Sequence, residues 1–154
     1  MRLILLTLLL LALPQPSMAA TVTRIVDADT LVLDNAIKIR LYGIDSPERG
    51  QPGGIDATEA AVALVLGQCV ELEAQYQDRY GRTVAIVILE SGDTLQEALL
   101  QKGMAWVVPR YCKRPECDYW RELEQSARLA RVGIWQDEHA VPPWEWRKQT
   151  RGSR

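Results

Sequence analysis

Acidic and basic side chains gather near the ends of predicted β-strands in the first third of the chain. They are Asp27, Asp29, Arg40, Asp45 and Glu48. Carboxylates that lie close together repel one another unless a cation neutralises them. Asp29 and Asp45 can converge on one hard cation, with the Ser46 carbonyl and water as further oxygen ligands. The alternative is that Asp27 and Asp29 only cap a turn.

Hydrolysis of a phosphodiester needs residues of the same kinds. A base must activate water, and cations must stabilise the charge that grows on the phosphoryl oxygens. Glu48 is a free carboxylate for the first task, and Arg40 and Arg82 are guanidinium groups for the second. Taken singly, each of these residues is better explained as a surface charge. Their order along the chain is the specific feature.

Short strands would position these groups. Alternation of apolar and polar residues predicts five strands, at residues 21–26, 30–33, 37–42, 70–76 and 83–89. In the third strand, alternation turns the isoleucines and Leu41 inward, so that Lys38, Arg40 and Tyr42 point outward. The guanidinium of Arg40 is therefore expected on an outer face.

Helices are predicted from their end signals. Capping-box patterns begin helices at Asp56 and Thr94, and a last helix runs from about Asp118 to Val132. This order predicts an α+β fold, a five-stranded OB-fold β-barrel with one helix between strands 3 and 4 and two C-terminal helices.

The two ends of the chain differ in composition from the middle. Residues 1–19 combine one basic residue, an apolar run and a small-x-small site, which predicts a signal peptide; an uncleaved membrane anchor is the alternative. Residues 20–136 then form the domain, and residues 137–154 form a Pro/Trp-rich strap with a basic tail. We expect a secreted or periplasmic protein without stable membrane association after signal cleavage.

Net charge and cysteine and histidine content limit which binding partners, disulfides and metal sites are expected. The whole chain has 18 basic and 20 acidic side chains, so net charge does not indicate a polyanion-binding protein. Cys112 and Cys117 lie five positions apart and can form a small disulfide loop, which leaves Cys69 over. His139 is the only histidine, so a zinc site is not expected.

Three motifs, VDADT, IRLYGIDSPE and DRYGR, follow one another along the chain. In order and spacing they resemble the staphylococcal-type nuclease (thermonuclease) family, over roughly residues 21–135. The resemblance implies that Asp29, Asp45 and the Ser46 carbonyl hold Ca²⁺, with Asp27 nearby through water. It also implies that Glu48 is the general base, and that Arg40 and Arg82 grip the phosphate and stabilise its transition state.

The resemblance further implies the reaction. Members of this family cleave DNA and RNA with Ca²⁺ and leave 3′-phosphates. By the same likeness Tyr80 lies on the substrate side, and Tyr111 is a candidate to stack on a base where Pro109 departs from the family pattern. We expect a monomer. Ala28 and Ser46 replace a glycine and a threonine of the best-known member, which is also strongly basic, unlike this chain.

Two other functions remain open at this point. A non-catalytic OB-fold module would bind nucleic acid without cutting it. A structural envelope protein would use Ca²⁺ for stability without turnover.

Overall fold

The computed structural model describes residues 18–152. Its centre is a closed barrel in the order β1-β2-β3-β6-β5, which confirms the predicted fold class. The barrel strands are β1 (Met18–Asp27), β2 (Thr30–Leu33), β3 (Lys38–Leu41), β5 (Cys69–Gln77) and β6 (Thr83–Ile88). A second sheet pairs β4 (Ile44–Asp45) with β7 (Trp106–Val107). These two strands were not predicted, because two residues are too few to show a periodicity.

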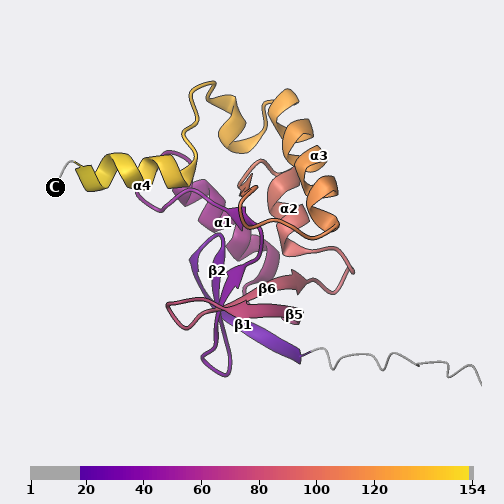
Figure 1. Ribbon diagram of the computed structural model, residues 1–154. Coiled ribbons are helices and arrows are strands. Elements are labelled where there is room, and N and C mark those ends of the chain that lie inside the picture. Colours follow the sequence, from indigo (N-terminus) through magenta and orange to yellow (C-terminus); the bar gives the residue numbers. More distant parts are fainter. Residues whose placement is uncertain (1–17, 153–154) are drawn as a thin grey trace, which may run out of the picture.

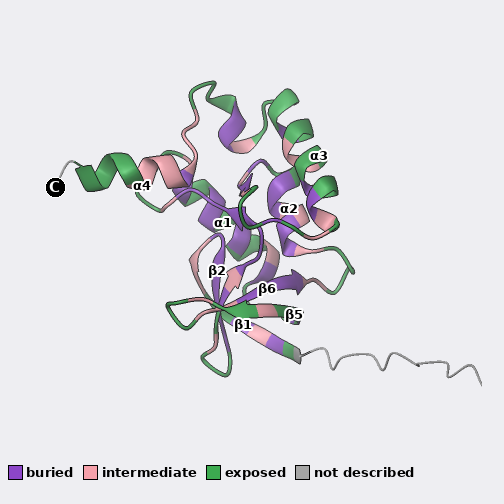
Figure 2. Ribbon diagram, in the orientation of Figure 1, coloured by how far each residue is buried: buried purple, intermediate pink, exposed green. Residues whose placement is uncertain are grey.

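The helices cover one end of the barrel (Figure 1). They are α1 (Gly54–Val65), α2 (Leu95–Gln101), α3 (Glu116–Leu129), the 3₁₀ turn η1 (Gly133–Gln136) and α4 (Pro143–Gly152). Buried residues concentrate in the barrel strands and in α2, whereas the outer half of α4 is exposed throughout (Figure 2). No helix in the described part of the chain is both long and apolar enough to cross a membrane.

One predicted helix start is confirmed and one is wrong. Thr94 caps α2 in a capping box, in which its hydroxyl accepts the Glu97 N–H at 3.1 Å and the Glu97 carboxylate accepts the Thr94 N–H at 2.8 Å. Helix α1 instead begins after Gly53, a residue with φ of 79° and no side-chain cap. Asp56 therefore lies within the first turn, where a carboxylate still interacts favourably with the helix dipole.

Strand β3 follows the predicted alternation until its end. Ile39 and Leu41 are buried in the barrel, Lys38 is exposed and Arg40 is half-buried. Tyr42 was predicted to point outward, but it is buried. The strand has ended there, and the ring packs edge-on against Trp120 of α3 at 6.4 Å between centroids.

The C-terminal segment differs from the predicted strap, since Pro143–Gly152 is the helix α4. Proline fits the first turn of a helix, where its missing N–H would have no partner in any case. Pro143 is buried, and Trp144 packs against a small apolar cluster that contains Trp106 and Trp135. This cluster joins the segment to the domain.

The predicted signal peptide, residues 1–19, lies outside the described residues except for its last two. Those two, Met18 and Ala19, pair with Leu72 and Glu71 in the β1–β5 ladder.

The cysteines are arranged as the sequence allowed. Cys112 and Cys117 are joined by a disulfide, and Cys69 is an exposed free thiol.

Candidate functional site: a carboxylate cluster bridged by arginines

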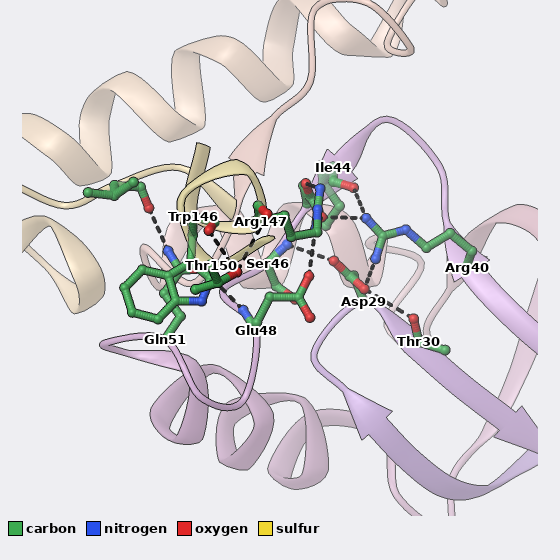
Figure 3. A network of polar contacts seen from close by, with 12 residues as sticks. Asp29, Thr30, Arg40, Ile44, Ser46, Glu48, Gln51, Trp146, Arg147 and Thr150 are labelled. Carbon is green, nitrogen blue, oxygen red and sulfur yellow. Dashed lines mark hydrogen bonds and ion pairs between the residues drawn. The ribbon is translucent and has the colours of Figure 1, made fainter. Parts of the chain in front are cut away.

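Asp29, Arg40 and Glu48 lie close together (Figure 3), and Arg40 also binds Asp45. Asp29 lies in the turn between β1 and β2, Arg40 on β3 and Asp45 on β4. The register between β2 and β3 brings Asp29 and Arg40 together. Thr30 pairs with Arg40, and the Leu41 N–H donates to the Asp29 carbonyl at 2.9 Å. The tight turn after β3 then brings Asp45 back toward them.

Asp29 is held by bonds to both of its carboxylate oxygens. Its Oδ2 accepts the backbone N–H of Ser46 at 2.7 Å, and its Oδ1 accepts the hydroxyl of Thr30 at 3.1 Å and forms an ion pair with Arg40. The side chain is only 2% exposed, so these bonds replace its hydration. Asp29 is thereby fixed in one orientation.

Arg40 links the two buried aspartates. Besides Asp29, its Nη2 donates to Asp45 Oδ1 at 2.6 Å and to the Ile44 carbonyl at 3.2 Å. The planar guanidinium can satisfy these acceptors at once because its donors form a rigid fork. The side chain stays 19% exposed, so one part of the fork remains open to solvent.

Glu48 lies beside this cluster, on the loop that leads into α1. Its backbone N–H donates to the Gln51 side-chain carbonyl at 3.3 Å, and its own carbonyl accepts the Gln51 N–H at 2.8 Å. Gly54 begins α1 against the Glu48 carbonyl so closely that any Cβ there would overlap it. The carboxylate itself is 41% exposed, as a base that meets a water molecule must be.

A further arginine in the cluster was missed by sequence reasoning. Arg147 of α4 donates through Nη2 to Asp45 Oδ2 at 2.6 Å and through Nη1 to Glu48 Oε1 at 2.5 Å. Burial lowers the pKa of this guanidinium, but hydrogen bonds to Asp45 and Glu48 outweigh it and raise the pKa above its ordinary value. Arg147 stands 102 positions after Asp45, and no local pattern could have placed it there.

Arg82 directly precedes β6, the strand that pairs in parallel with β3. Within the described residues, Arg82 has no hydrogen bond or ion pair with Asp29, Asp45 or Glu48. Its Nε and Nη2 instead each lie 2.7 Å from Asp78 Oδ2 across the β5–β6 turn. The role of Arg82 on a phosphate therefore stays a prediction.

The two predicted substrate-side tyrosines are both exposed. Tyr80 is 66% exposed and lies beneath the guanidinium groups of Arg79 and Arg82, at 4.8 and 5.5 Å from its centroid. Tyr111 is 55% exposed, with Arg110 at 5.7 Å. Aromatic rings open to solvent beside arginines suit the stacking of bases.

Tyr76 of β5 carries a phenol whose pKa is affected by several of these residues. Burial raises the pKa of its phenol, and Tyr42, Tyr111 and Asp78 raise it further, whereas Arg40 lowers it. Register agrees with these effects, because Tyr76 of β5 and Arg40 of β3 both pair with Val84 of β6.

The donor set fits a hard divalent cation. Three carboxylates, those of Asp29, Asp45 and Glu48, meet two guanidinium groups, and Asp27 Oδ1 is buried without a hydrogen-bond partner. Oxygen-only donors with excess negative charge are what Ca²⁺ or Mg²⁺ requires. Among the described residues, no group of three acidic, histidine or cysteine side chains is arranged to hold a metal ion, and Asp45 is paired with both arginines. The Ser46 carbonyl remains a predicted ligand.

Comparison with known proteins agrees with this arrangement. Residues 38–137 match the family described as Staphylococcal nuclease homologue. A staphylococcal-like nuclease of Arabidopsis thaliana is 42% identical over 121 residues, which are 79% of this chain and 36% of that protein. A micrococcal nuclease of Shigella flexneri is 36% identical over 143 residues, 86% of this chain and 82% of that protein.

An uncharacterized 38.1 kDa protein of Capnoides sempervirens is 42% identical over 123 residues, 80% of this chain and 35% of that protein. The chain thus spans about a third of the length of the plant relatives and about four fifths of the bacterial relative. The family match extends from β3 to η1 and includes Arg40, Asp45, Glu48 and Arg82, whereas β1, β2 and Asp29 precede it. The chain belongs to the staphylococcal nuclease family.

Proposed function

We propose that the protein is a metal-assisted phosphodiesterase, a nuclease that cleaves DNA and RNA with little sequence specificity. The observation that carries this proposal is the Arg40 guanidinium held between Asp29 and Asp45, with the Glu48 carboxylate beside them and open to water. A fixed cationic fork next to an accessible base is what attack of water on a phosphate needs. The names of the Arabidopsis and Shigella relatives support the same activity.

In the proposed reaction, Glu48 accepts a proton from a water molecule as the water oxygen attacks phosphorus. The P–O5′ bond breaks, the leaving oxygen takes a proton from solvent, and the products are a 5′-hydroxyl and a 3′-phosphate. Arg40 and Arg82 donate to the phosphoryl oxygens as their charge grows. Asp29, Asp45 and the Ser46 carbonyl would hold Ca²⁺, which supplies Lewis-acid stabilisation of the same charge. Asp78 keeps Arg82 extended beside β6 until substrate arrives.

Stacking on Tyr80 and Tyr111 supports the weak sequence specificity, because every base has a face that can stack. The net charge of −2 indicates that affinity for the backbone rests on local arginines rather than on a basic surface. We also propose that the protein acts in the periplasm or outside the cell. The leader-like residues 1–19 and the disulfide of Cys112 and Cys117 support this location.

Cleavage of plasmid DNA and of RNA by residues 20–154 tests the proposal. Activity should appear with Ca²⁺, vanish with chelator and return when Ca²⁺ is added back. Glu48→Gln should lower turnover by about 10²–10⁴-fold, since the amide cannot accept the proton. Glu59→Gln, at an exposed position on α1, is the matched control and should cleave normally. Full activity in chelator, or equal turnover in the two variants, would contradict the assignment.

A further inference from the structure

Arg147 binds the two carboxylates that the proposed reaction uses most directly. One terminal nitrogen lies 2.6 Å from Asp45 Oδ2, the other 2.5 Å from Glu48 Oε1 and 3.4 Å from Asp45 Oδ1. Together with Arg40, it leaves neither oxygen of Asp45 free of a guanidinium. A cation ligand and a general base are thereby both engaged by one side chain (Figure 3).

The helix that carries Arg147 is lightly attached. Its first turns touch the domain through buried Pro143 and half-buried Trp144, and Gln51 donates to the Val141 carbonyl just ahead of it at 2.5 Å. From Lys148 onward every described residue is exposed, and the helix projects past the domain (Figures 1 and 2). An element with so little buried surface can leave its site without disturbing the core.

Charge explains why the helix and a cation would exclude each other. With Arg147 in place, the carboxylates of Asp29, Asp45 and Glu48 carry one negative charge more than the two arginines neutralise. Without Arg147 the excess is two, which matches a divalent ion. Arg147 also occupies Asp45 Oδ2, the oxygen that Arg40 leaves open, so a cation bound to Asp45 would compete with Arg147 for that oxygen.

We propose that Arg147 is an intramolecular plug of the carboxylate site, and that α4 and a divalent cation bind there in competition. This inference rests on the proposed function, because it takes Asp45 as a cation ligand and Glu48 as the base. The plug keeps both carboxylates neutralised while Ca²⁺ is scarce. Saturation with Ca²⁺ releases α4 and frees Glu48 to accept a proton. The cluster would then become active only where calcium is abundant.

Calorimetric titration of the full chain with Ca²⁺ alone tests the competition without any substrate. Arg147→Gln should bind Ca²⁺ about tenfold more tightly than the unchanged protein, the scale of one partly exposed charge-assisted contact. Arg151→Gln is the matched control, because it removes the same charge from an exposed position on the same helix. Its Ca²⁺ affinity should equal that of the unchanged protein.

Hydrogen exchange gives a second readout, independent of affinity. Saturating Ca²⁺ should speed exchange in residues 143–152 of the unchanged protein and leave α3 protected. In Arg147→Gln those residues should exchange fast even in chelator. Equal or weaker Ca²⁺ binding by Arg147→Gln, or protection of α4 that Ca²⁺ does not change, overturns the plug while leaving the nuclease proposal in place. If no variant binds Ca²⁺, the cation site itself is wrong and the competition falls with it.

Discussion

Replacement of Arg40 by methionine should destabilise the protein before any reaction is considered. Arg40 is the partner of two carboxylates that are only 2% and 4% exposed, those of Asp29 and Asp45. Removing one partner of a buried ion pair typically costs about 3–5 kcal/mol, because the remaining charge stays buried without compensation. Arg40 itself is 19% exposed and Asp45 keeps its pair with Arg147, so the lower end, about 3 kcal/mol, applies here.

Urea unfolding in chelator, followed by tryptophan fluorescence, measures this loss. For a chain of this size, about 3 kcal/mol corresponds to a fall in Tm of about 6–12 °C. Arg24→Met is the control, because Arg24 is exposed on β1 and should cost less than about 0.5 kcal/mol. Saturating Ca²⁺ should restore part of the loss in Arg40→Met, since the ion neutralises the same carboxylates. A loss below about 1 kcal/mol in chelator would refute the idea that Arg40 compensates buried charge.

Four more outcomes are expected. Arg82→Lys should lower turnover about a hundredfold with little loss of DNA affinity, because an ammonium cannot present two donors in a planar fork to the developing phosphoryl charge. Single-turnover kinetics separate the effect on turnover from the effect on affinity. Gly54→Ala should destabilise the protein by more than about 1 kcal/mol in urea unfolding, because its Cβ overlaps the Glu48 carbonyl. A thiol assay of the denatured, unreduced protein should find one thiol, that of Cys69. Burial raises the pKa of the Asp78 carboxyl, but hydrogen bonds from Arg82 outweigh burial and lower the pKa in the folded state. The stability that these bonds contribute is present above the unfolded pKa of about 4. It is lost as pH falls through the folded pKa. The urea midpoints of the unchanged protein and Asp78→Asn should therefore differ at pH 7, and the difference should shrink as pH falls through the folded pKa.

Local signals were enough to predict the barrel. Alternation of apolar residues gave the strands, because one face of each strand is buried and the other is not. The Thr94 capping box was readable because both of its bonds join residues three positions apart. The family motifs placed Asp29, Arg40 and Asp45 in neighbouring elements, and the register between β2 and β3 brings them into contact.

The features that sequence reasoning missed all depend on distant packing. Tyr42 is buried because α3 lies over it, and nothing in its own strand signals that helix. The segment after residue 140 has too few apolar residues to show a helical stripe, and its two prolines suggested an irregular strap. Arg147 looked like one member of a basic tail, since its partners Asp45 and Glu48 lie about a hundred positions earlier.

The parallel pairing of β3 with β6 has a consequence for how the protein folds. All other barrel ladders in the described chain are antiparallel, whereas this one joins Ile39 to Thr83 across the intervening α1 and β5. Contacts between segments so far apart form late, because a long loop must close before they can stabilise anything. Arg40 lies on β3 and Arg82 directly precedes β6, so the two arginines lie on opposite strands of this ladder. The two arginines that are proposed to bind phosphate therefore reach their relative positions only when this loop has closed. A chain in which the loop is still open would hold Asp29 and Arg40 together without Arg82 beside them.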